Sequence, residues 1–165
     1  MKRWIPWAFA VALAVFPAGP VWAEVTLQVT PVQGGASLEV DFGTARSLGA
    51  EGEEESDTVI RQVRLNVTSN SGRPYQVFQR VNGPWTGPDG KEVPMSAVRF
   101  FISETRGGTN RFPSSAPLDL GEQEIFLSDP SGPADELLLT YTVKLPVGQR
   151  AGSYRTTVSY RVVAQ

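Results

Sequence analysis

The densest group of potential ligand atoms in this sequence is an acidic segment near residue 50. Its carboxylates are Glu51, Glu53, Glu54, Glu55 and Asp57. Calcium binds carboxylate oxygens that converge from a flexible loop, so this segment is the candidate metal site. Calcium loops usually space Asp and Asn around a glycine, whereas glutamate dominates here. A solvated loop between two strands, whose charge discourages edge-to-edge association, explains the same residues and stays open as the alternative.

The sequence contains neither cysteine nor histidine. It therefore has no thiol nucleophile, no imidazole base and none of the commonest zinc and copper ligands. Serine and threonine lack a histidine partner, no Ser-x-x-Lys stretch offers a lysine base, and no pair of carboxylates is marked for a shared cleft. We predict no catalytic residue, no cofactor and no enzymatic activity.

Aromatic side chains in the middle of the chain form a candidate ligand contact. Trp85 lies in a turn rich in proline and glycine, and with Tyr75 and Phe101 it could present faces on which a sugar stacks. Alternatively these rings belong to the core, and Trp85 folds its loop back onto a sheet. Trp85 is the candidate glycan contact, with the core interpretation left open beside it.

The first 23 residues have the pattern of a secretory signal peptide. Lys2 and Arg3 precede an apolar run that is too short for the roughly 20 residues of a spanning helix, and small residues precede the expected cleavage point after Ala23. We expect a secreted chain that begins at Glu24, resides in the periplasm or on the cell surface of a bacterium, and has no membrane span after cleavage. Residues 24–165 are enough for one domain without disulfides.

The charge of the chain gives no attraction to nucleic acid. The formal net charge is −2 and becomes more negative when Lys2 and Arg3 leave with the signal peptide. The remaining basic residues are dispersed along the sequence rather than clustered. We therefore expect no nucleic-acid partner.

Residues 24–165 alternate apolar and polar side chains in short runs, and no window keeps a helical period for three turns. This pattern predicts an all-β fold, an immunoglobulin-like two-sheet antiparallel β-sandwich of about seven to eight strands. The rows expected to share a face are Val25, Leu27 and Val29; Leu38, Val40 and Phe42; Arg61, Val63, Leu65 and Val67; Tyr75, Val77, Gln79 and Val81; Val98, Phe100 and Ile102; Ile125 and Leu127; Leu137, Leu139, Tyr141, Val143 and Leu145; Tyr154, Thr156, Val158, Tyr160 and Val162.

The two ends of the domain are both well-formed strands. We expect residues 137–145 and 154–162 to form a hairpin through the turn at 146–152, with the strand that begins near Val25 on the other edge of the last strand. The first strand could complete its own sandwich in this way. It could also leave its own domain and add to a neighbouring subunit through backbone hydrogen bonds.

The closing phrase Leu145-Pro146-x-Gly148-x-x-Ala151-Gly152-x-Tyr154, with the alternating strand after it, resembles the end of bacterial secreted pilin-type and spore-coat-U-like sandwich domains. Asp41-Phe42-Gly43-Thr44 is similar to the entry phrase of the same group. The resemblance implies a fold that lacks one strand, which a periplasmic chaperone supplies first and the next subunit supplies later. The donor positions would be Val25, Leu27 and Val29. The acceptor groove would be bordered by Tyr154, Val158, Tyr160 and Val162.

From these observations we expect an exported structural or interaction module, a fimbria-like or surface-coat subunit that assembles through strand edges. Its partners would be other protein subunits or a periplasmic chaperone. The alternative is a stand-alone periplasmic or cell-surface domain that binds a glycan or a protein ligand.

Overall fold

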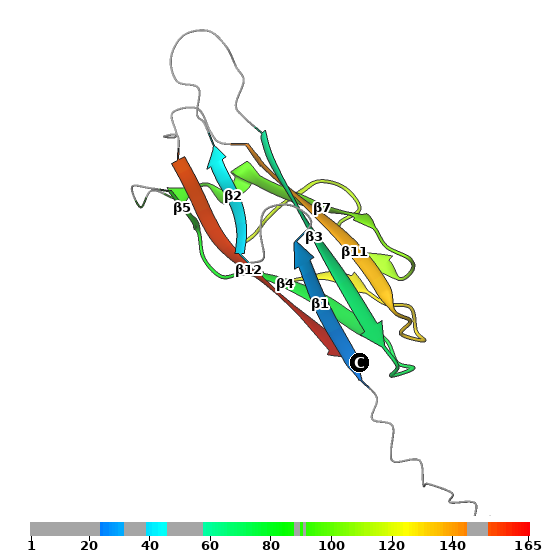
Figure 1. Cartoon of the computed structure of the whole chain (residues 1–165). Helices are drawn as coiled ribbons and strands as arrows, with labels where there is room; N and C mark the ends of the chain where they lie inside the picture. Colours follow the sequence, from blue (N-terminus) through cyan, green and yellow to red (C-terminus); the bar gives the residue numbers. More distant parts are fainter. Residues whose placement is uncertain (1–23, 32–38, 46–57, 88–89, 91, 145–151) are drawn as a thin grey trace, which may run out of the picture.

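The computed structural model describes residues 24–31, 39–45, 58–87, 90, 92–144 and 152–165. These residues form two antiparallel sheets packed face to face, so the predicted all-β sandwich is confirmed (Figure 1). Eight strands of seven or more residues occur in the described ranges, together with four strands of two residues each and one short 3₁₀ turn, Met95–Ala97.

The first sheet contains the strands that place the start of the domain. Its order is β1-β3-β11-β7-β9, and every neighbouring pair is antiparallel. The strands are β1 (Val25–Pro31), β3 (Thr58–Ser69), β11 (Asp135–Lys144), β7 (Val98–Glu104) and β9 (Ala116–Pro117). β1 is therefore an edge strand, hydrogen-bonded to β3 alone among the described strands.

The second sheet contains the last strand of the chain. Its order is β6-β5-β12-β4-β10-β8, and β2 pairs with β12 outside this path. The strands are β2 (Glu39–Ala45), β4 (Tyr75–Val81), β5 (Trp85–Thr86), β6 (Glu92–Val93), β8 (Thr109–Asn110), β10 (Gly121–Leu127) and β12 (Gly152–Ala164).

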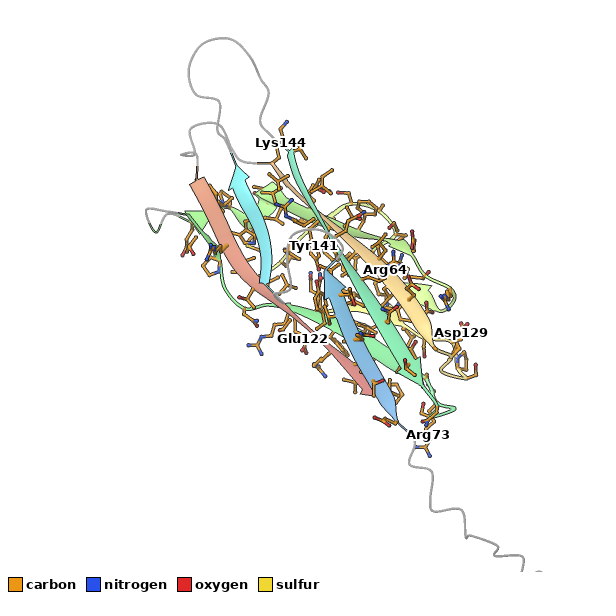
Figure 2. All side chains as sticks on the ribbon, in the orientation of Figure 1. Arg64, Arg73, Glu122, Asp129, Tyr141 and Lys144 are labelled. Atoms are coloured by element: carbon orange, nitrogen blue, oxygen red, sulfur yellow. The ribbon has the colours of Figure 1, made fainter. Side chains whose placement is uncertain are left out.

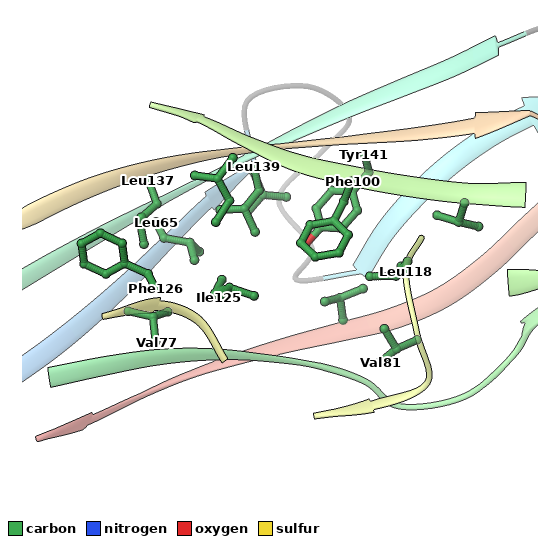
Figure 3. Packing of buried hydrophobic residues seen from close by; sticks show 14 of the residues in the cluster. Leu65, Val77, Val81, Phe100, Leu118, Ile125, Phe126, Leu137, Leu139 and Tyr141 are labelled. Carbon is green, nitrogen blue, oxygen red and sulfur yellow. The ribbon is translucent and has the colours of Figure 1, made fainter. Parts of the chain in front are cut away.

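The core fills the space between the two sheets with the alternating residues that the sequence predicts. Leu65 of β3, Val77 of β4 and Leu139 of β11 have no exposed surface, and Phe100 stacks on Tyr141 with ring centroids 5.9 Å apart (Figure 3). Each large apolar side chain buried in this way stabilises the fold by about 1.5–3 kcal/mol. The sandwich is therefore held by ordinary apolar packing between its sheets.

One predicted row is wrong in β10. The sequence predicts Ile125 and Leu127 on the inner face, whereas the fully buried pair is Ile125 and Phe126. The register against β4 shifts between Glu124 and Phe126, which is the signature of a β-bulge. An extra residue in the bulge turns two successive side chains into the core and leaves Leu127 only half-buried.

The predicted hairpin between residues 137–145 and 154–162 is also wrong. β11 is a central strand with β3 on one edge and β7 on the other, so neither edge can accept β12. β12 lies in the opposite sheet and pairs instead with β2, β4 and β5. The strand at Val25 does not pair with β12 either, because β1 runs along β3 in the first sheet.

Candidate interaction edge

The two halves of β12 have different neighbours. Residues 152–157 pair with β2 on one edge, and Arg155 pairs with β5 on the other. Residues 158–164 pair with β4 on one edge. In the described part of the chain no strand pairs with these residues on the opposite edge, which we call the open edge.

Two backbone hydrogen bonds show which groups of β12 point to the open edge. The N–H of Asn82 donates to the carbonyl of Thr157 at 2.9 Å, and the N–H of Gln165 donates to the carbonyl of Pro74 at 2.8 Å. Both fall on the β12–β4 register, so the odd-numbered residues between them exchange hydrogen bonds with β4. The even-numbered residues direct their N–H and C=O groups to the open edge. These are Val158, Tyr160, Val162 and Ala164.

β1 presents a second edge on the same side of the sandwich, and no described strand pairs with it. Asn70 donates its N–H to the carbonyl of Glu24 at 3.1 Å, so the even-numbered residues of β1 pair with β3 and the odd-numbered ones point away. Cα atoms of β1 approach those of β12 within 8 Å, although the two strands belong to different sheets. Figure 1 shows the end of β12 beside the start of β1.

The side chains of these two strands are apolar and incompletely covered. Val25, Leu27 and Val29 of β1 and Tyr160 and Val162 of β12 are half-buried and pack against the core. Two strand edges with unpaired backbone groups therefore flank a strip of half-buried apolar side chains. We call this region the open side.

The structure separates the β12 residues that the sequence groups together. Val158 is buried at the start of the open edge, followed by half-buried Tyr160 and Val162. Tyr154 is buried in the half of β12 that pairs with β2, and its ring lies where a side chain at Gly87 would have to fit. Tyr154 is thus a core residue outside the open edge.

A chain of buried hydrogen bonds supports the open edge from inside. The Tyr141 hydroxyl of β11 donates to Oε1 of Gln79 at 2.8 Å and lies 2.7 Å from the Tyr160 hydroxyl. Nε2 of Gln79 in turn donates to Oε1 of Gln123 at 3.2 Å. Burial raises the pKa of Tyr141 well above its ordinary value, with a further contribution from Tyr160, and burial also raises the pKa of Tyr160. Both hydroxyls therefore stay neutral and link the two sheets beneath β12.

In the sequence, Gln79 lies in a row of inward-facing residues, and nothing there assigns it a role. Its position in a row with Tyr75, Val77 and Val81 indicates a buried amide, and a buried amide needs hydrogen-bond partners.

An ion pair holds the same half of β12 on the outer face of the second sheet. Arg161 donates from Nε and Nη2 to the two carboxylate oxygens of Glu122, both at 2.6 Å, and its guanidinium lies 4.3 Å from the centroid of the Phe78 ring (Figure 2 labels Glu122). The hydrogen bond from Arg161 lowers the pKa of Glu122, and the same bond raises the pKa of Arg161. With Arg80 and Ser159 these residues line a shallow hollow of about 240 Å³.

The structure describes the candidate glycan contact Trp85 but not the candidate calcium ligands of the acidic segment. The Trp85 side chain is fully buried, as the core interpretation expects, so its ring offers no face to a sugar. Tyr75 is also fully buried, and Phe101 is half-buried.

The proposed calcium ligands Glu51, Glu53, Glu54, Glu55 and Asp57 lie outside the described residues. Within the described ranges, no three His, Cys, Asp or Glu side chains are grouped as metal ligands.

The described residues form a two-sheet β-sandwich. In its last strand, β12, residues 158–164 pair with β4 on one edge, and no described strand pairs with them on the other. The sequence matches no protein-family model and no curated protein. In the portion of the chain that the structure covers, no helix has the length and apolar character needed to cross a membrane.

Proposed function

We propose that this protein is an exported structural subunit, of a fimbria-like fibre or a surface coat, that assembles through its strand edges. The observation that carries the proposal is the open edge of β12, residues 158–164. Its outward N–H and C=O groups can pair with an added strand, and the half-buried apolar side chains beside it can be covered by alternate residues of that strand.

The contrast with the other sheet edges supports this assignment. Soluble β-proteins usually protect exposed edges with very short strands, proline, lysine or bulges. The far ends of the two sheets are the two-residue strands β6, β8 and β9, and β9 contains Pro117, whereas β2, a longer edge strand among the described strands, lies beside the open edge on β12. Residues 158–164 contain no proline and no lysine, and no register shift interrupts their pairing with β4. Their one charged residue, Arg161, is paired with Glu122 on the outer face of the sheet, so the backbone of the open edge is not protected by proline, lysine or a bulge.

The partner that we propose is a strand from another subunit or from a periplasmic chaperone. The segment around Val25, Leu27 and Val29 has the alternation that such a strand needs, and it already packs against this side of its own sandwich. The same segment in a neighbouring subunit is the candidate donor. Export through the signal peptide at residues 1–23 would bring donor and acceptor together outside the cytoplasm.

A second candidate function is a stand-alone periplasmic or cell-surface binding domain. The hollow beside Arg161 favours it, because the hollow combines the Phe78 ring with the charged groups of Arg80 and Glu122. The Arg161 guanidinium lies over the Phe78 ring, and charged hydrogen-bonding groups beside a ring in a concave site suit a glycan or a polar segment of a protein. For this function Phe78 takes the place of Trp85 as the candidate contact.

Assembly can be measured on the chain from residue 24 to residue 165. We expect the purified chain to form oligomers whose size increases with concentration in sedimentation velocity. A variant that lacks residues 24–33 should lose this self-assembly because it has no donor strand. It should still bind a synthetic peptide of residues 24–33, because the acceptor edge on β12 is intact.

The alternative predicts another pattern. A chain that stays monomeric at all concentrations, and whose truncated form is unfolded and binds no peptide, would contradict strand-edge assembly. A stand-alone binding domain should remain monomeric and bind ligands on a glycan array, and Phe78→Ala should abolish that binding.

A further inference from the structure

The start of β1 is held by a single side chain from the turn that follows β3. Oδ1 of Asn70 accepts a hydrogen bond from the backbone nitrogen of Glu24 at 2.7 Å, while the Asn70 N–H donates to the Glu24 carbonyl at 3.1 Å. Asn70 thus satisfies both backbone groups of one residue, and we call this pair of bonds the Asn70 clamp. If the signal peptide is removed after Ala23, the nitrogen in the clamp becomes the α-amino group, and its positive charge strengthens the bond.

The turn that carries Asn70 is itself fixed. The Ser71 hydroxyl donates to the carbonyl of Arg73 at 3.1 Å, and the N–H of Arg73 donates back to that hydroxyl at 3.2 Å. Gly132, at a φ of +56°, packs so closely on the carbonyl of Arg73 that a Cβ there would overlap it. Figure 2 places Arg73 at the end of the molecule where β1 begins. The clamp is therefore built on a rigid turn.

β1 pairs with β3 from Val25 to Pro31, and no described strand covers its other edge. Its only hydrogen-bonded neighbour among the described strands is β3, and its inward side chains are half-buried. An edge strand of this kind opens more readily than a strand with neighbours on both sides. The clamp at its first residue is thus well placed to decide whether β1 stays docked.

The position of β1 also limits access to the open edge. Packed sheets lie about 10 Å apart face to face. The Cα atoms of β1 approach those of β12 within 8 Å from the opposite sheet, and Val25, Leu27 and Val29 of β1 already pack against the core there. The inward side chains of a strand that adds along β12 would meet those of β1, so full addition requires β1 to move aside.

We propose that the Asn70 clamp controls strand addition, because it holds β1 in a position that obstructs the open edge of β12. Release of Glu24 from Asn70 allows β1 to leave β3, which exposes the open edge of β12 to a strand from a second subunit. Asn70 acts here as a positioning residue. This inference rests on the proposed function.

The test compares Asn70→Ala with two matched variants in the chain from residue 24 to residue 165. Asn70→Asp keeps the oxygen acceptor of the clamp. Asn82→Ala makes the same change in the turn after β4, where the side chain reaches Ser159 and not β1. The first readout is amide hydrogen exchange at Thr26 and Gln28, which pair with β3. The second is the rate at which the monomer captures a fluorescent peptide of residues 24–31.

We expect Asn70→Ala to accelerate exchange at Thr26 and Gln28, and peptide capture, by roughly three- to tenfold, the effect of one lost hydrogen bond. Neither Asn70→Asp nor Asn82→Ala should be faster than the wild type in either measurement. Equal exchange at Thr26 in all four proteins would show that the Asn70 side chain does not hold β1 in place. If Asn70→Ala exchanges faster but captures peptide at the wild-type rate, the Asn70 clamp does not control strand addition. Faster exchange in Asn70→Ala while no variant captures peptide would support the clamp and contradict strand-edge assembly itself.

Discussion

Val162→Pro abolishes assembly and leaves a folded monomer, if strands add to β12 at its open edge. Val162 directs its N–H away from β4, so proline removes a donor that the monomer does not use within its own sheet. The added strand loses that donor and meets the proline ring in its path. Sedimentation velocity should show a monomer at concentrations where the wild type oligomerises. The free energy of unfolding should fall by about 1–2 kcal/mol, mainly from the lost valine side chain.

Val163→Pro is the matched control, because Val163 is the same residue type, is also half-buried and lies next in the strand. Its N–H points to β4, opposite Gln76, so proline removes a bond inside the sheet. We expect a loss of about 3 kcal/mol or more in the free energy of unfolding, measured by urea denaturation. Equal effects of the two prolines on stability would contradict the hydrogen-bond directions assigned to β12. Undiminished assembly of Val162→Pro would contradict the role of the open edge.

Tyr141→Phe is expected to have the second-largest effect, on stability. The change removes the donor to Oε1 of Gln79, which is fully buried, and it also removes the partner of the Tyr160 hydroxyl. A buried polar group that loses its partner costs about 1–3 kcal/mol, and two groups are affected here. We expect the free energy of unfolding to fall by about 2–4 kcal/mol in urea denaturation.

The double variant Tyr141→Phe/Gln79→Met tests the cause of that loss. Methionine has a similar volume to glutamine and needs no hydrogen bond, so the double variant should regain at least half of the lost stability. A double variant whose losses simply add would show that Gln79 and Tyr141 are not coupled. The hydrogen bond from Tyr141 to Gln79 would then not be the cause of the lost stability.

The strands could be predicted because alternation of side chains follows directly from the pleat of a strand. The row Val63, Leu65 and Val67 is buried as expected, and so are Leu137 and Leu139. Each strand needs only its own local pattern for such a prediction. The fold class therefore followed from the sequence without knowledge of strand order.

Strand order could not be predicted in the same way. β11 and β12 are consecutive in the chain, and consecutive strands often pair, but here they lie in opposite sheets. Which edge a strand uses depends on where all the other strands lie, and no local pattern records that. The bulge that buries Phe126 is equally invisible, because it arises from the register between β10 and β4.

The candidate site was predictable in part. The alternation at Val25 and Val162 marks two strands with one apolar face, and both lie at the open side. The support from Tyr141 and Gln79, and the Asn70 clamp, depend on side chains that are far apart in the sequence. The burial of Trp85 follows from packing of its two-residue strand against the core, which its Pro/Gly-rich surroundings do not reveal.

Amide hydrogen exchange along β12, resolved by residue with NMR, tests the central claim most directly. In the monomer we predict fast exchange at Tyr160 and Val162, whose N–H groups face the open edge, and exchange slower by about a hundredfold at Arg161 and Val163. In the assembled form Tyr160 and Val162 should become as protected as their neighbours. Strong protection of Tyr160 and Val162 already in the monomer, or continued fast exchange in the assembly, would contradict strand addition at this edge.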